Sequence, residues 1–90
     1  SGRQGLKVTL GIMPDFTAGD IKGLRVAGIT PGGPASMAGM QKGDVIVALD
    51  GKPVNDIYEY MNRLKTLHKG QRVNVDIQRG QEKVVLIVEL

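Results

Sequence analysis

The stretch of sequence that decides the fold reads GGPASMAGMQKGDVIVALDGKPV, residues 32–54. Its first part has the composition of a turn, because two glycines precede Pro34, and proline also suits the first position of a helix. We therefore expect a short helix over residues 34–38. Gly39 ends that helix as a residue that readily adopts a left-handed backbone.

The second part of this stretch has the pattern of strands and a turn. Residues 44–49 form a nearly continuous run rich in β-branched side chains, which predicts a strand buried on both faces. Asp50 and Gly51 mark a tight turn after that run. Pro53 and Val54 then predict a short edge strand.

The flanking sequence adds strands on both sides and one longer helix. Apolar residues recur at helical spacing from Asp56 to Leu67, and Asp56 with Glu59 fits an acidic capping box. Alternating apolar residues predict further strands over residues 6–12, 24–29, 73–77 and 84–90. Because strands and helices do not alternate throughout, we expect an α+β fold, a small barrel or sandwich of five to six strands with one short and one longer helix.

The composition narrows the possible functions. A chain of 90 residues makes one small domain, and with two tyrosines and one phenylalanine its core must be mainly aliphatic. No cysteine and a single histidine leave too few ligands for the usual metal and haem-thiolate sites. Dinucleotide, phosphate-loop and nucleophile-elbow motifs are missing, so we expect no cofactor and no catalytic residues in this segment. No apolar run reaches the length of a membrane span.

The basic residues near the end of the longer helix allow two interpretations. Five basic or potentially basic side chains between Arg63 and Arg72 either form a solvated helix face or attract nucleic acid. The net charge of +3 is small, and the tyrosines lie at the opposite end of the helix, so the solvated face is favoured. We interpret His68 as a surface side chain rather than a catalytic base.

One group of residues indicates a binding site. If the first strand turns at Gly11, successive backbone N–H groups can point into one concavity, which would hold a carboxylate. An extended peptide could then add to the free strand edge, with its last side chain between Leu10, Ile12 and Leu64. A bulged core strand beside a core helix explains the same residues equally well.

The pattern from Leu6 to Leu90 resembles a PDZ domain of the bacterial type. The matching pieces are Thr9-Leu10-Gly11-Ile12 and the whole of residues 32–54. The resemblance implies a PDZ domain over residues 5–90. Ser1 and Gly2 would suit a pair left by tag removal, so we expect residues 1–4 to be a tag remnant or linker. Such domains belong to extracytoplasmic proteases: high-temperature-requirement serine proteases, C-terminal processing proteases and zinc aminopeptidases.

Within that family, residues 10–16 and 56–61 look most like the aminopeptidase group. The family's carboxylate-binding amides fall on Leu10, Gly11 and Ile12, and its side-chain pocket includes residues of the longer helix. The candidate peptide-binding residues are Leu10, Gly11, Ile12, Met13, Pro14, Ile57, Met61 and Leu64.

The resemblance also implies partners and a location. We expect peptide or protein C-termini with an apolar last residue, because every candidate pocket side chain is aliphatic or methionine. Pro14 has no N–H, so strand addition should be limited to about the last one or two ligand residues. The parent's catalytic domain is the other expected partner, and the alternative function is a structural domain that packs on it without binding free peptide. An extracytoplasmic location follows from the resemblance alone.

Overall fold

The computed structural model describes residues 8–17, 19 and 21–90. Within these residues the elements are β1 (Ile12–Pro14), β2 (Leu24–Ile29), α1 (Pro34–Met37), β3 (Val45–Leu49), β4 (Lys52–Pro53), α2 (Ile57–Leu64), β5 (Arg72–Arg79) and β6 (Glu82–Glu89). The expected α+β class, with six strands, one short helix and one longer helix, is confirmed.

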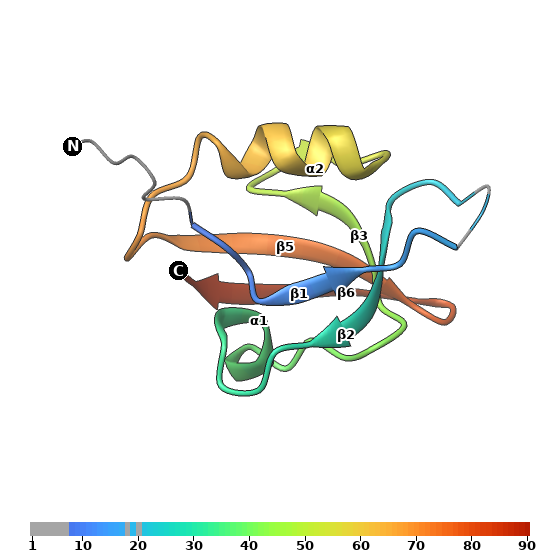
Figure 1. Ribbon diagram of the computed structural model, residues 1–90, viewed down its shortest axis with the longest axis horizontal. Coiled ribbons are helices and arrows are strands. Elements are labelled where there is room, and N and C mark those ends of the chain that lie inside the picture. The colour runs from blue at the N-terminus through green and yellow to red at the C-terminus, as the bar shows by residue number, and fades with distance from the viewer. Residues whose placement is uncertain (1–7, 18, 20) are drawn as a thin grey trace.

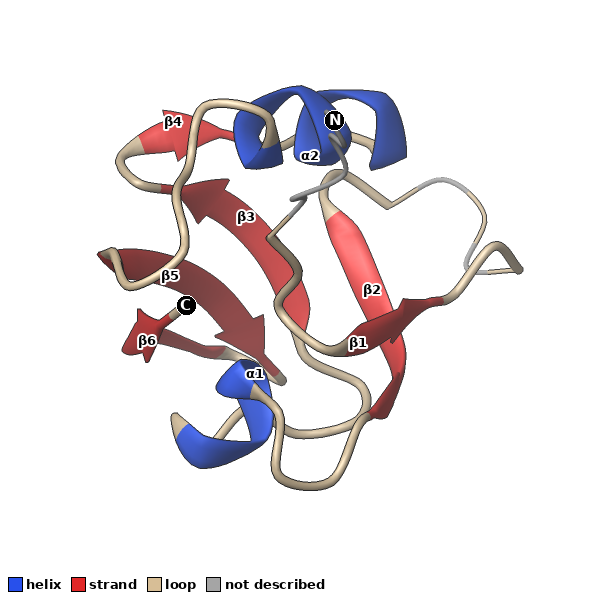
Figure 2. Cartoon of the chain, turned by 60° about the vertical axis from the view of Figure 1, so that its left-hand side comes forward, coloured by secondary structure: helices blue, strands red, loops and turns tan. Residues whose placement is uncertain are grey.

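The strands form one antiparallel sheet whose order places β1 at an edge. The order is β1-β2-β3-β5-β6, and β4 pairs with β3 outside this path. Helix α2 lies across one end of the curved sheet, and α1 lies across the opposite end (Figures 1 and 2). Among the strands of the described residues, β1 pairs only with β2, which leaves its other edge free.

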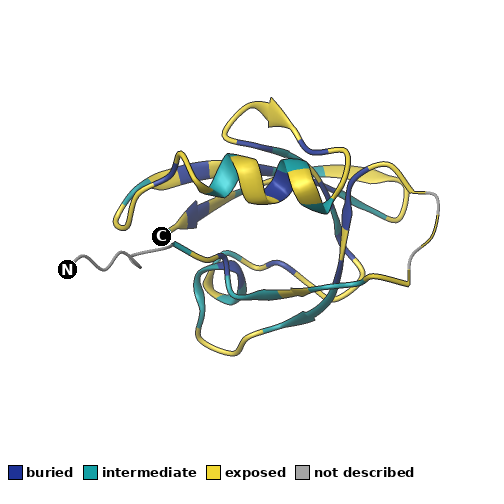
Figure 3. Ribbon diagram, turned by 45° about the horizontal axis from the view of Figure 1, so that its top comes forward, coloured by how far each residue is buried: buried dark blue, intermediate teal, exposed yellow. Residues whose placement is uncertain are grey.

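The core is aliphatic, as the composition predicts. Tyr60 is its one aromatic side chain, whereas Phe16 and Tyr58 are exposed. Figure 3 shows α2 largely exposed or half-buried, with a single buried stretch, and Tyr60 is the buried residue of this helix. The large side chains with almost no exposed surface are Leu10, Val26, Ile46, Leu49, Val54, Val73, Val75, Ile77 and Val88.

Two predicted strands differ from the structure. The predicted strand over residues 6–12 was wrong in its described part, because residues 8–11 form no ladder and β1 begins at Ile12. Val8 and Leu10 still turn inward, and alternation of burial alone does not require strand pairing. The first residues of that predicted strand lie outside the described residues. β3 is not buried on both faces, since Val47 is exposed whereas Ile46 and Leu49 are buried.

The N-terminus of α2 is capped nearly as predicted. The Asp56 carboxylate accepts a hydrogen bond from Glu59 N at 2.9 Å. Glu59 Oε1 accepts a hydrogen bond from Asn55 N at 2.8 Å, whereas a capping box predicts one from the N–H of Asp56, one residue later. The helix ends at Leu64, earlier than predicted, although Leu67 is still buried in the turn that follows. This cap fixes the start of α2 beside the β2 end of the sheet.

A buried ion pair ties the loop after α1 to the end of β5. Asp44 is 1% exposed, and its carboxylate accepts hydrogen bonds from Arg79 Nε and Nη2, both at 2.9 Å. Gln41 N donates to the same carboxylate at 2.8 Å. Burial by itself raises the pKa of Asp44, but the hydrogen bonds from Arg79 and Gln41 and the charge of Arg79 together hold it below its ordinary value.

Candidate functional site

The backbone at Gly11 adopts a left-handed conformation, with φ of 77°. Two neighbouring carbonyl groups are held by the protein: Leu10 O accepts from Ala35 N at 2.8 Å, and Gly11 O accepts from Thr30 N at 2.9 Å. In a trans peptide the C=O and the following N–H point in opposite directions. The N–H groups of Gly11 and Ile12 therefore point away from these anchors, toward the side where the sequence predicts a bound carboxylate.

The Gly11 N–H already has a weak partner within the loop. It donates to Thr9 Oγ1 at 3.1 Å, and this contact is exposed. An ionised carboxylate is a stronger acceptor than a hydroxyl, so a ligand carboxylate can replace Thr9 at this N–H. The loop therefore has the hydrogen-bonding chemistry of a carboxylate site.

The edge of β1 is free on the side away from β2. Ile12 lies opposite Ile29, and a register shift follows between Met13 and Pro14. Asp15 N donates to Arg25 O at 2.9 Å, so the preceding Pro14 C=O points away from β2, as the Ile12 N–H does. The edge thus offers a donor and an acceptor at Ile12 but only an acceptor at Pro14, because proline has no N–H.

The candidate side chains do not all lie where the resemblance implies. Leu10 has no exposed surface, so it supports the loop from the core instead of lining an open pocket. Met13 is on the opposite face of β1 from Ile12, and its Cε lies only 2.5 Å from where a Cβ on Gly28 would be. Met13 therefore offers only its backbone on the α2 side of the strand.

The remaining candidates lie at the boundary between the core and solvent. Ile12 of β1 and Ile57 and Leu64 of α2 are half-buried and pack against the core cluster. Met61 is 53% exposed and shares a helix face with Ile57 and Leu64 by its spacing. These side chains can provide an apolar surface beside the β1 edge. His68 is exposed at the other end of this region, as interpreted from the sequence.

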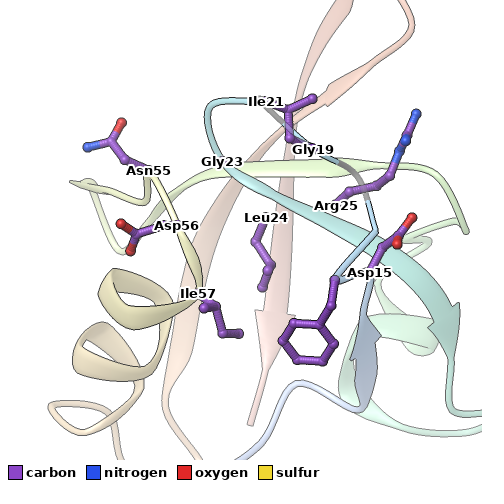
Figure 4. Close-up of a pocket in the computed structure, with 10 residues that line it drawn as sticks. Asp15, Gly19, Ile21, Gly23, Leu24, Arg25, Asn55, Asp56 and Ile57 are labelled. Atoms are coloured by element: carbon purple, nitrogen blue, oxygen red, sulfur yellow. The ribbon is translucent and has the colours of Figure 1, made fainter.

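The structure also contains a pocket that the sequence analysis missed. It has a volume of about 180 Å³ and lies between the loop after β1, the start of β2 and the start of α2. Its apolar lining consists of Phe16, Ile21, Leu24 and Ile57. In Figure 4 the side chains of Leu24 and Ile57 point into this space. Phe16, a large apolar residue within an otherwise polar loop sequence, is the one sequence signal that could have indicated this pocket.

Charged groups stand at the rim of this pocket. Asp15 accepts from Thr17 Oγ1 at 2.6 Å and from Thr17 N at 2.8 Å. These hydrogen bonds, with a smaller contribution from the charge of Arg25, lower the pKa of Asp15 below its ordinary value. Asp56 is engaged by the N-terminus of α2. The polar ends of Asn55 and Arg25 point away from the middle of the pocket (Figure 4).

The described residues contain neither a metal-binding cluster nor a membrane-spanning helix. Across residues 8–17, 19 and 21–90, no three His, Cys, Asp or Glu side chains are grouped as a metal site would need. In the same part of the chain, no helix has the length and apolar character to span a membrane.

Comparison with known proteins gives the family. Residues 5–90 match the family model described as PDZ domain. The putative serine protease HhoA of Synechocystis is 32% identical over 74 residues, which cover 82% of this chain and 19% of HhoA. The periplasmic pH-dependent serine endoprotease DegQ of Escherichia coli is 29% identical over 99% of this chain and 20% of its own length. The chain thus spans about a fifth of these relatives.

Solved structures support the same fold but not the closer assignment to the aminopeptidase group. The HtrA-type protease AlgW with decapeptide has a TM-score of 0.81 at 28% identity, over 92% of this chain and 28% of that one. An aminopeptidase N family protein of Idiomarina loihiensis has a TM-score of 0.83 over 99% of this chain and 14% of its own. Its 22% identity shows the fold alone. The expected aminopeptidase group is therefore not supported, since the relatives in sequence are serine proteases.

Proposed function

This chain belongs to the PDZ domain family, and from that premise we propose that it is a non-catalytic module that binds peptide or protein C-termini by strand addition at β1. The observation that carries the proposal is the loop at Gly11. Its carbonyls are held by Ala35 N and Thr30 N, and its N–H groups are directed to the start of a free strand edge. A carboxylate at these amides would place the last ligand residue beside Ile12.

The surface beside this edge favours an apolar last residue. The last side chain would enter the space between β1 and α2, where Ile12, Met61 and Leu64 supply aliphatic and thioether groups. A charged side chain there would lose hydration without gaining a partner. Binding should therefore depend on two features of the ligand, a free carboxylate and an apolar terminal side chain.

The parent of the domain is proposed to be a serine protease outside the cytoplasm. HhoA and DegQ are named as serine proteases, and DegQ is named as periplasmic. The structure of AlgW with a decapeptide supports peptides as partners for this fold. The catalytic domain of such a parent is the second proposed partner.

A structural role in the parent is the alternative, and one surface favours it. Val85 and Ile87 of β6 are more than half exposed on the face of the sheet that points away from the core. Contiguous exposed apolar patches mark contacts with other protein surfaces, and these two side chains could form part of such a patch. Under this alternative the domain would pack on the catalytic domain through β6 and would bind no free peptide.

Binding of free peptides decides between the two functions. We suggest titrating this chain with a library of fluorescent heptapeptides, each made with a free C-terminal carboxylate and as the amide. The proposed function predicts that apolar C-termini bind, and that amidation weakens binding at least about tenfold, because a charge-assisted hydrogen bond is lost. Equal binding of acids and amides, or no binding at all, would contradict it and leave the structural role.

A further inference from the structure

We propose that the pocket lined by Phe16, Ile21, Leu24 and Ile57 holds the side chain of the fifth residue from the C-terminus of the bound peptide, and that this residue is apolar. The inference rests on the proposed function, because the peptide must first occupy the β1 edge. The pocket is separate from the rest of the candidate site. Of the candidate peptide-binding residues it includes only Ile57, and not Met61 or Leu64.

The register of an added strand leads to this pocket. In an antiparallel pair, a step forward on one strand is a step back on the other. If the last ligand residue lies opposite Ile12, the third from the end lies opposite Pro14, where β1 ends. A ligand that continues in extended form beyond this point brings its fifth residue from the end to the level of Phe16, which lies in the turn that follows. Side chains of alternate strand residues point to the same face. The fifth side chain therefore points to the same side as the last one, toward α2 and the pocket.

The chemistry of the lining selects an apolar group. Four of the ten lining residues are aliphatic or aromatic, and the others include Asp15, Arg25, Asn55 and Asp56 at the rim. A volume of about 180 Å³ is smaller than the range of about 300–1,000 Å³ typical of small-molecule sites. It suits one side chain. The rim carboxylates of Asp15 and Asp56 accept hydrogen bonds from Thr17 and from Glu59 N. They repel an acidic side chain, and an ion pair between a basic side chain and a solvent-exposed carboxylate would contribute little.

The pocket also compensates for the defect in the strand edge. Pro14 cannot donate a hydrogen bond to the third ligand residue from the end, so the backbone ladder is weak beyond Ile12. A side chain buried against Phe16 would hold the upstream part of the ligand without any further ladder bond. The expectation that strand addition is limited to the last one or two ligand residues then applies to backbone hydrogen bonds and not to side-chain contacts further along the ligand.

The test begins with the ligand. Free-carboxylate heptapeptides with valine at the last position would be randomised either at the fifth position from the end or at the fourth, whose side chain points away from α2. We expect apolar residues to be selected at the fifth position and none at the fourth. Carboxylate-dependent binding without selection at the fifth position would overturn the pocket and leave the proposed function standing. Loss of any dependence on the carboxylate would overturn both.

The second arm uses two exposed aromatic residues of the chain. Phe16 is 77% exposed and lines the pocket, whereas Tyr58 is 75% exposed and does not. Phe16→Ala should lower affinity about 3- to 10-fold for a peptide with leucine at the fifth position, and leave affinity unchanged for its alanine counterpart. Tyr58→Ala should change neither. Equal effects of Phe16→Ala on both peptides would show that the two side chains do not meet, and would overturn the inference.

Discussion

Replacement of Gly11 by alanine tests the carboxylate loop, and the chain offers a matched control in Gly51. The two glycines have nearly the same backbone, with φ of 77° and 78°. A Cβ on Gly11 would lie 3.4 Å from Pro34 Cδ, an ordinary contact, and a Cβ on Gly51 would meet nothing within 4 Å. Both alanines therefore fit but are strained, and each should cost about 1–2 kcal/mol of stability.

The two variants should differ in binding. Relief of the strain at position 11 rotates the backbone that directs the Gly11 and Ile12 N–H groups, whereas the same relief at Gly51 occurs in the turn between β3 and β4. Misaligning one hydrogen bond to a charged acceptor costs about 1.5–3 kcal/mol. Gly11→Ala should therefore weaken binding of a carboxylate peptide about 10- to 150-fold, and Gly51→Ala should leave it unchanged.

Two measurements separate stability from binding. Urea unfolding gives the free energy of each variant, and fluorescence anisotropy gives its affinity for the acid and the amide of one peptide. Gly11→Asn provides a third variant, because asparagine tolerates the left-handed region, and it should retain more stability and affinity than Gly11→Ala. If Gly11→Ala keeps the wild-type ratio of acid to amide affinity, the amides near Gly11 do not bind the carboxylate.

Three further changes test the strand edge, the buried ion pair and the helix cap. Pro14→Ala supplies the missing N–H and should raise affinity about 2- to 10-fold for peptides of three or more residues but not for dipeptides; equal gains for both would argue against strand addition. Arg79→Met leaves the Asp44 carboxylate buried, and because Arg79 is 31% exposed we expect a loss of about 2–4 kcal/mol at pH 7 by urea unfolding. The pKa of Asp44 is lower in the folded wild type than in the unfolded chain, where it is about 3.9. The ion pair therefore stabilises the folded protein fully above about pH 3.9, and this stabilisation is lost as the pH falls through the pKa of the folded state. The difference between wild type and variant should thus shrink below about pH 4, and a constant difference would contradict the assignment. Asp56→Ala removes the bond to Glu59 N and should cost about 0.5–2 kcal/mol in the same assay, whereas no change would show that water replaces the cap.

Elements with local signals could be predicted from the sequence. Pro34 and Gly39 mark the ends of α1, and the periodic apolar residues with Asp56 identify α2. The strand over residues 6–12 was misplaced because alternation reports which side chains turn inward and not which backbone groups pair. Leu10 is fully buried, yet its C=O bonds to Ala35 N at the start of a helix. Backbone pairing of that kind depends on tertiary structure.

Part of the candidate site could also be predicted from local signals and part could not. The turn at Gly11 follows from the conformational freedom of glycine, and the family resemblance indicated that α2 lies beside it. The pocket at Phe16 could not be predicted, because it joins the loop after β1 to residues 55–57. No periodicity relates segments so far apart in the chain. For the same reason the sequence did not show that Met13 faces away from α2 while Ile12 faces the boundary of the core.

Pro14 and the shortness of β1 bear on what the edge can select. A free strand edge pairs readily with any extended chain, and proteins restrict such edges by making them short or by placing proline in them. β1 has three residues and ends in Pro14, so an internal segment of a partner would gain few ladder bonds here. A chain end adds its carboxylate at Gly11 and Ile12. The proposed preference for C-termini thus comes as much from the weakness of the edge as from the loop. Pro14→Ala should strengthen binding of amidated peptides by the same factor as that of acids, because the added N–H serves both, and it would so raise the affinity of ligands that have no terminal carboxylate.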